Sequence, residues 1–136
     1  FFPLLFILTY TSSSHNQEFM EFYHSLPIQI RFNDIDLAQH VNNSVYQEYF
    51  DLGRLNYFEK AMGKAMAFSG LSMVIASCKV DFFKPLFLTD STFVETRVDA
   101  LGTKSLEMVQ RIMHKGESEP RAGAVMVRVP LMRVRV

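Results

Sequence analysis

The decisive stretch is residues 31–54, RFNDIDLAQHVNNSVYQEYFDLGR, in which a polar first half is followed by an apolar second half. The apolar character continues on more than one face to Met62 without a proline, which predicts a helix over residues 43–62 that other elements must largely enclose. Asn42 or Asn43 is suited to begin this helix, because an Asn side-chain oxygen accepts a hydrogen bond from a first-turn amide. The sequence therefore predicts one long, enclosed helix with polar residues at its start.

The polar residues directly before the predicted helix are candidates for chemistry. Asp34, Asp36 and His40 precede the helix start, where unpaired first-turn amides and the positive end of the helix dipole lie. A carboxylate beside free amide donors suits a reaction in which negative charge develops on an oxygen atom. For Asp34 we prefer a structural interpretation, as the partner of Arg31 or as a turn cap.

Strand patterns flank the helix on both sides. Residues 27–32, PIQIRF, alternate between apolar and polar side chains, as a half-buried strand does. Four further strands are predicted after the helix, near residues 72–83, 90–100, 104–115 and 122–134. This order predicts a single α+β domain in which an antiparallel sheet curls around the helix.

The composition argues against several classes of protein. The 136 residues are 49% apolar and 13% aromatic, enough for one core, and 14 basic and 14 acidic residues cancel. Without net charge there is no global field to attract nucleic acid or a membrane surface. The single cysteine, Cys78, excludes an intramolecular disulfide and disfavours a cysteine-based zinc site. We therefore expect a cytoplasmic protein that uses no metal and no cofactor.

The first residues, 1–19, read FFPLLFILTYTSSSHNQEF and begin with an apolar run that is too short to span a bilayer. The segment lacks the basic start and the small-residue cleavage site of a secretory signal. We interpret it as an upstream or disordered segment and expect residues 20–136 to form one domain.

The sequence DIDLAQHVNN at 34–43, followed by Tyr46, resembles the signature of the hot-dog-fold thioesterases. The resemblance is to the 4-hydroxybenzoyl-CoA thioesterase-like acyl-CoA thioesterases and to the acyl-ACP thioesterases. Residues 78–90, CKVDFFKPLFLTD, are similar to the second-strand segment of this family, and the similarity spans about residues 26–129. It implies the hot-dog fold, a curled antiparallel sheet of about five strands wrapped around one long central helix. It also implies a homodimer or homotetramer with active sites at the subunit interface.

The same resemblance implies a catalytic role for Asp36, which matches the carboxylate that acts as nucleophile or general base on the thioester. The alternative is that Asp36 only caps a turn. His40 would orient Asp36 or the attacking water, and Asn43 would bond to Asp36 or to the substrate carbonyl, although each has a structural role as its alternative. Amides near Asn43 and Ser44 would form the oxyanion hole.

Other residues are predicted to bind the substrate. The acyl chain would lie in a tunnel lined by helix residues, and a lysine would meet the phosphates of CoA. Interior aromatic residues and solvated lysines are the commoner explanations of such side chains. The predicted substrate-binding residues are Asn42, Tyr46, Tyr49, Phe50 and Lys84, with Lys79 and Arg97 as further phosphate candidates.

Two departures from the acyl-ACP pattern bear on the substrate. Ala38 stands where those enzymes usually have Asn, and Lys84 and Pro85 stand in the region where they have a cysteine. We therefore expect an acyl-CoA thioesterase, which hydrolyses an acyl-CoA to free acid and CoA. An acyl-ACP thioesterase and a non-catalytic protein that binds acyl thioesters are the alternatives.

Overall fold

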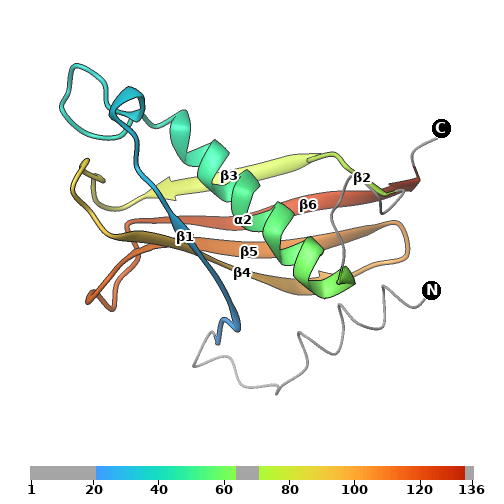
Figure 1. Cartoon of the computed structure of the whole chain (residues 1–136). Helices are drawn as coiled ribbons and strands as arrows, with labels where there is room; N and C mark the ends of the chain where they lie inside the picture. Colours follow the sequence, from blue (N-terminus) through green and yellow to red (C-terminus); the bar gives the residue numbers. More distant parts are fainter. Residues whose placement is uncertain (1–20, 64–70, 134–136) are drawn as a thin grey trace.

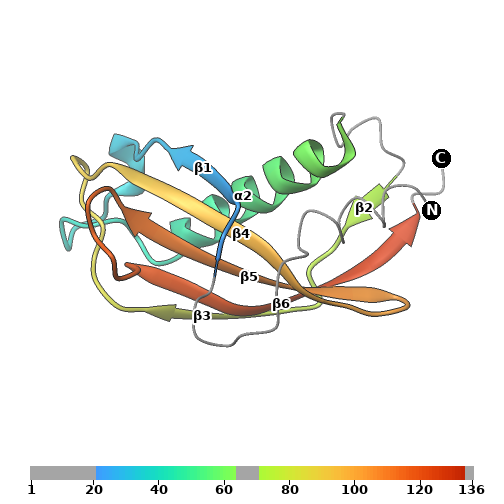
Figure 2. The ribbon, with the colours of Figure 1, turned by 90° about the horizontal axis from the view of Figure 1, so that it is seen from below.

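The computed structural model of the protein describes residues 21–63 and 71–133. Figure 1 shows one helix lying across one face of a curved sheet, and Figure 2 shows the same layers from below. The elements in chain order are β1 (His24–Ile28), the 3₁₀ turn η1 (Phe32–Asp34), α2 (Val45–Met62), β2 (Leu71–Met73), β3 (Ser77–Phe82), β4 (Thr92–Leu101), β5 (Ser105–His114) and β6 (Ala122–Arg133).

The strands of the described ranges form one sheet of six strands in the order β1-β4-β5-β6-β2, with β3 also paired to β6. All of these pairs are antiparallel. The helix carries apolar residues on the side that faces the sheet, and they are buried there with residues of β4 and β5. The largest apolar members of this core are Tyr46, Tyr49, Phe50, Tyr57, Phe58, Leu86, Leu106, Met108 and Ile112. The expected architecture, an antiparallel sheet curled around one long helix, is therefore confirmed.

The helix and the sheet come closest at Gly53. A Cβ atom at this position would lie 2.7 Å from Val94 Cγ1 and 3.0 Å from Gln110 Nε2, so only a hydrogen atom fits. This approach lets Gln110 Nε2 donate a 2.9 Å hydrogen bond to the carbonyl oxygen of Phe50. Arg54 Nη1 in turn donates to Gln110 Oε1 at 2.6 Å. These bonds satisfy polar groups that would otherwise be costly to bury, and they fix the position of α2 along the sheet.

The boundaries differ from the predicted ones in two places. The first strand, predicted over residues 27–32, runs instead from His24 to Ile28, because the chain turns at η1, where the Asp34 carboxylate accepts a hydrogen bond from the Arg31 amide. The strand predicted over 72–83 is two strands, since β2 pairs with residues 131–133 of β6 whereas β3 pairs with residues 122–128. The sheet therefore has one short strand more than the five expected.

Residues 1–19, predicted to be an upstream or disordered segment, lie outside the described residues. Within the described ranges, no helix combines the length and the apolar character that crossing a membrane requires.

Candidate active site

A tight turn before α2 brings two of the predicted catalytic residues together. Ile35 and Val41 form an isolated antiparallel bridge, and the Asp36 amide donates to the His40 carbonyl oxygen at 3.2 Å. The turn is completed by the Gln39 amide, which donates to the Asp36 carbonyl oxygen at 2.9 Å, with Gln39 in the left-handed region at φ 66°. The main chains of Asp36 and His40 are therefore paired across the base of one turn.

The side chains of Asp36 and His40 remain half-exposed. Asp36 Oδ1 accepts a hydrogen bond from the Ala38 amide at 2.8 Å, so this carboxylate caps the turn. His40 Nδ1 lies 3.2 Å from the Val41 carbonyl oxygen, to which it can donate a hydrogen bond, and this contact orients the ring. The turn-capping alternative for Asp36 is thus present, and it leaves the second carboxylate oxygen without a partner among the described residues.

The two asparagines at the start of α2 have different roles. Asn42 Oδ1 accepts hydrogen bonds from the Ser44 amide at 2.9 Å and from Ser44 Oγ at 2.8 Å, and the Asn42 carbonyl oxygen accepts from the Val45 amide at 2.9 Å. Asn42 therefore caps the turn that leads into α2. The N-cap position itself is Ser44, whose side chain makes no capping hydrogen bond, so the prediction of an asparagine N-cap was wrong. Asn43 is exposed, and its amide has no acceptor within the described part of the chain. This amide can bind an oxygen atom of a ligand.

Asp34 lies behind this turn and is buried, with 3% of its surface exposed. Its carboxylate accepts hydrogen bonds from Tyr49 Oη at 2.6 Å, from the Arg31 amide at 2.9 Å and from Arg31 Nη2 at 3.3 Å. Burial pulls the pKa of Asp34 upward, but these hydrogen bonds outweigh it and hold the pKa below its ordinary value. Burial and the contact with Asp34 raise the pKa of Tyr49. The expected contact of Asp34 with Arg31 is present, whereas the contact with Tyr49 was not predicted.

Tyr46 connects the helix to the loop that follows β3. Its hydroxyl oxygen accepts a 3.2 Å hydrogen bond from the Leu86 amide, and its ring meets Phe82 edge to face with centroids 5.0 Å apart. The Leu86 carbonyl oxygen accepts from the Val41 amide at 2.8 Å. Burial raises the pKa of Tyr46. The loop after β3 therefore packs directly on the turn that carries Asp36 and His40.

The remaining predicted binding residues lie apart from one another. Phe50 is fully buried in the core, and Lys84 is exposed in the loop after β3. Lys79 pairs with Asp81 at 3.5 Å. The guanidinium of Arg97 lies over the Phe22 ring. Of the phosphate candidates, only Lys84 shares a loop with Leu86 and hence lies next to the turn.

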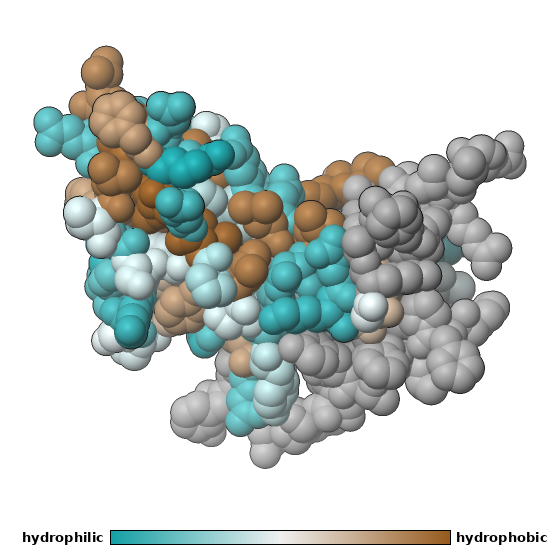
Figure 3. Space-filling model, viewed as in Figure 1, coloured by the Kyte–Doolittle hydropathy of each residue, from teal (hydrophilic) through white to brown (hydrophobic). Residues whose placement is uncertain are grey.

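A cavity of about 950 Å³ lies between β1, α2 and the segment that joins β2 to β3. Figure 3 shows apolar side chains running along the face that carries α2, beside hydrophilic ones. Tyr49 lines this cavity, and Phe50 does not. Most of the lining side chains are apolar, and Arg31 and Glu48 line the end nearer η1. The apolar ones include Leu26, Ile28, Leu52, Leu55, Val74 and Ile75.

The charged side chains of the cavity wall are largely paired. Arg31 Nη2 lies 3.5 Å from Glu48 Oε2, and this ion pair joins the segment between β1 and η1 to α2. Arg54 is 2% exposed and pairs with Asp51 as well as with Gln110, and burial lowers its pKa to about 10. No three His, Cys, Asp or Glu side chains in the described ranges are arranged to hold a metal ion.

The sequence pattern of the thioesterase-like superfamily matches residues 30–134. The match covers the turn of residues 35–41, which we call the site turn, together with α2 and strands β2 to β6. The chain therefore belongs to the thioesterase-like superfamily, and its fold is the hot-dog fold.

Known proteins resemble the chain to different degrees. Protein THEM6 of Xenopus laevis is 30% identical over 82 residues, which are 60% of this chain and 40% of that protein, so the chain spans less than half of this relative's length. A thioesterase from Thermus thermophilus, solved with coenzyme A and Zn, is 31% identical with a TM-score of 0.68 and covers 84% of this chain and 83% of its own.

Two further solved structures are similar. A protein from Xanthomonas campestris, proposed to be an acyl-CoA thioesterase, is 27% identical with a TM-score of 0.70 over 81% of this chain and 93% of its own. A protein from Pseudomonas aeruginosa, proposed to be a thioesterase, has a TM-score of 0.75 over 83% of this chain and 86% of its own. At 24% identity, the latter supports the fold alone.

Proposed function

We propose that the protein is an acyl-CoA thioesterase, which hydrolyses R–CO–S–CoA with water to a carboxylic acid and free CoA. The observation that carries this proposal is the pairing of Asp36 and His40 across one turn, directly before a helix start whose Asn43 amide has no acceptor among the described residues. A thioester carbonyl needs both a base or nucleophile and a donor for its developing oxyanion.

Each residue of the turn has a role in this reaction. Asp36 attacks the thioester carbonyl or takes a proton from the attacking water, and its free carboxylate oxygen is the one that acts. The Asn43 amide binds the carbonyl oxygen as negative charge develops on it, whereas the Ser44 amide, also predicted for this role, is already bonded to Asn42 Oδ1. His40 orients Asp36 or the water, and the Asn43 side chain binds Asp36 or the substrate carbonyl.

The cavity between β1 and α2 is the proposed site of the acyl chain. It is lined mainly by apolar side chains, and its polar end, at Arg31 and Glu48, adjoins η1 and hence the site turn. Tyr49 lines the cavity from the helix, Tyr46 holds the loop after β3, and Asn42 holds the turn before the helix in place. Lys84, exposed in the adjoining loop, is the proposed contact for the CoA phosphates. The coenzyme A bound to the Thermus thermophilus relative supports this substrate class.

We also propose that the protein is a homodimer at least. β3 pairs with β6 along one side, and within the described residues no strand pairs with its other side. Large apolar side chains are exposed at the end of β3 and in the loop after it, namely Phe82, Phe83, Phe87 and Leu88. A second copy that pairs along β3 would cover this edge and these side chains, and it would bring a neighbour close to the site turn.

Acyl-ACP hydrolysis and non-catalytic binding of acyl thioesters remain the alternatives. The first uses the same turn with a protein-bound substrate, and it would show a higher kcat/KM with an acyl carrier protein than with CoA of equal chain length. The second would show binding of acyl-CoA with no release of thiol.

The test is hydrolysis of a panel of short, long and aromatic acyl-CoAs by the parent protein and by Asp36→Asn, followed by thiol release. Asn keeps the oxygen that accepts from the Ala38 amide, so the turn stays closed while the charge and the basic oxygen are lost. We expect kcat to fall at least about a hundredfold with an unchanged unfolding midpoint. Asp99→Asn, on an exposed carboxylate of β4, is the matched control and should retain parental activity. Equal rates for the parent and Asp36→Asn would overturn the mechanism.

A further inference from the structure

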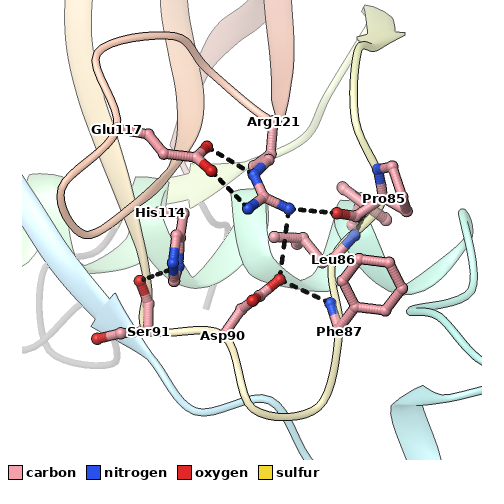
Figure 4. Close-up of polar contacts among 9 residues, drawn as sticks. Pro85, Leu86, Phe87, Asp90, Ser91, His114, Glu117 and Arg121 are labelled. Atoms are coloured by element: carbon pink, nitrogen blue, oxygen red, sulfur yellow. Dashed lines mark hydrogen bonds and ion pairs between the residues drawn. The ribbon is translucent and has the colours of Figure 1, made fainter.

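Arg121, directly before β6, makes an unusually complete set of contacts for a single side chain (Figure 4). Its Nε and Nη2 donate to the two carboxylate oxygens of Glu117 at 2.7 Å each. Its Nη1 donates to the Pro85 carbonyl oxygen at 2.5 Å and to Asp90 Oδ2 at 3.4 Å. The side chain is 10% exposed, so all three guanidinium nitrogens are engaged in a site with little water.

The backbone of Arg121 is bound to the same loop. Its carbonyl oxygen accepts hydrogen bonds from the Phe83 amide at 2.9 Å and the Lys84 amide at 3.0 Å, and its amide donates to the Ile112 carbonyl oxygen of β5 at 2.8 Å. Arg121 therefore joins the sheet to the loop of residues 83–91 through both its main chain and its side chain. No part of that role is visible in the local sequence around position 121.

The contact with Pro85 bears on the site turn through a single peptide group. The Pro85 carbonyl oxygen and the Leu86 amide belong to the same planar peptide, whose atoms move together. Arg121 holds the oxygen end of this peptide, and the Tyr46 hydroxyl oxygen accepts from its N–H end at 3.2 Å. A charged donor on the carbonyl also polarises the peptide and strengthens the bond that its N–H donates.

The next peptide of the loop contacts the site turn itself. The Leu86 carbonyl oxygen accepts from the Val41 amide at 2.8 Å, and both residues are fully buried. Val41 is one half of the bridge that closes the turn carrying Asp36. A continuous chain of contacts thus runs from Arg121 through the Pro85–Leu86 peptide to Val41 and to the start of α2.

The far end of the loop, at Asp90 and Ser91, is also held by hydrogen bonds. Asp90 Oδ2 also accepts from the Phe87 amide at 2.8 Å, so the carboxylate that meets Arg121 also shapes the loop. The Ser91 carbonyl oxygen lies 3.1 Å from His114 Nδ1 and accepts from the Lys115 amide at 2.9 Å. The loop is consequently anchored on both sides of Leu86, and Arg121 anchors it at the residue directly before Leu86.

We propose that Arg121 is a positioning residue for the proposed thioester hydrolysis, because it fixes the Pro85–Leu86 peptide and thereby Val41 and Tyr46. Val41 closes the turn that carries Asp36, and Val41 and Tyr46 lie on either side of residues 42–45, where α2 begins. This inference rests on the proposed function. Lysine cannot replace arginine here, because one ammonium group cannot span Glu117, Asp90 and the Pro85 carbonyl with the fixed fork of a guanidinium.

The experiment compares Arg121→Lys with the parent in two independent measurements. In steady-state hydrolysis of an acyl-CoA, we expect kcat to fall at least about tenfold with KM changed less than about threefold, because small displacements of reacting groups cost rate rather than binding. In amide hydrogen exchange, we expect the Val41 and Leu86 amides to exchange at least about tenfold faster, with the buried Val94 amide of β4 unchanged.

Glu117→Gln is the matched control, since Glu117 binds the opposite side of the guanidinium and leaves the contact with Pro85 in place. It should keep kcat within about threefold of the parent and leave the Val41 exchange rate unchanged. If Arg121→Lys does not fold, Tyr46→Phe removes the other partner of the same peptide and should accelerate exchange at Leu86.

The outcomes separate this inference from the proposed function. Parental kcat and parental exchange in Arg121→Lys would overturn the positioning role. Equal acceleration of exchange at Val94 would also overturn it, because the effect would then be global. If the parent itself hydrolyses no acyl thioester, the proposed function fails, and local acceleration at Val41 and Leu86 still supports the role of Arg121 in holding the turn.

Discussion

The Tyr49 hydroxyl donates a 2.6 Å hydrogen bond to Oδ2 of Asp34, and this bond joins the last residue of η1 to the second turn of α2. The two aspartates of the early doublet therefore differ in role. Asp34 is buried and accepts several hydrogen bonds, whereas Asp36 is half-exposed with one carboxylate oxygen free among the described residues. Asp34 thus has a structural role: it helps to hold in place Asp36, the residue proposed to react.

Tyr49→Phe should lower the free energy of unfolding by about 1.5–3 kcal/mol, the range for a hydrogen bond to a charged group. The ring stays in place and the carboxylate loses a donor while remaining buried. Urea unfolding followed by fluorescence or circular dichroism measures the change. Tyr23→Phe, at an exposed tyrosine, is the control and should shift stability by less than about 0.5 kcal/mol. Equal effects of the two substitutions would show that the contact with Asp34 contributes nothing.

The lowered pKa of Asp34 predicts an acid-dependent loss of stability. The unfolded chain binds a proton at Asp34 more readily than the folded chain, so the contribution is complete above the ordinary pKa of about 3.9 and is lost as the pH falls through the lower folded value. The stability difference between the parent and Asp34→Asn should therefore be largest near pH 7 and shrink below about pH 4. Urea titrations at several pH values measure it, and a constant difference would contradict the prediction.

Gly53→Ala should destabilise the protein, although alanine normally favours a helix interior by about 0.5–1 kcal/mol over glycine. The added Cβ would lie 2.7 Å from Val94 Cγ1, which forces the helix away from the sheet and costs about 1–3 kcal/mol. The hydrogen bond from Gln110 to the Phe50 carbonyl would lengthen with it. Thermal unfolding measures the effect, and a stabilised variant would mean that α2 does not approach the sheet so closely.

Leu55 offers a test of the proposed acyl site, because its side chain lines the cavity and is 38% exposed. Leu55→Trp should fill part of the cavity and lower kcat/KM for long acyl chains about tenfold relative to short ones. Leu55→Ala should shift the preference in the opposite direction. The ratio of kcat/KM values for a long and a short acyl-CoA measures both. An unchanged ratio in both variants would place the acyl chain elsewhere.

Phe83 tests the proposed dimer, since it is 58% exposed at the end of β3. Phe83→Glu would place a charge in the proposed interface and should convert the dimer to a monomer at micromolar concentration, because an unpaired charge is costly to bury. Sedimentation equilibrium measures the mass of the species. Lys115→Glu, on the turn after β5, is the control and should leave the mass unchanged. A parent that is monomeric at high concentration would contradict the proposal.

The fold followed from patterns that act over short distances in the chain. The long apolar run after Asn43, without proline, predicted α2 almost to its ends, and alternation predicted β4, β5 and β6 to within a few residues. The break between β2 and β3 was missed, because it depends on which residues of β6 each of them pairs with. A pairing partner some 50 residues away leaves no local signal in the strand itself.

The site was predictable only in part for the same reason. Asp36, His40 and the capping asparagine lie within one short segment, so spacing and capping rules apply to them directly. The contact of Asp34 with Tyr49 joins residues 15 apart, and the contact of Arg121 with Pro85 joins residues 36 apart. Neither pair has a periodicity or a motif, and both arise only when the sheet curls around the helix.

The bridge between Ile35 and Val41 has a consequence for laboratory evolution of this protein. Because the bridge fixes both ends of the turn, residues 37–39 can exchange side chains far more readily than they can change in number. An inserted residue would break the pairing or displace Asp36 from His40. Libraries of substitutions at 37–39 therefore provide a route to new substrate ranges, whereas libraries of insertions would first destroy the shape that makes the turn useful.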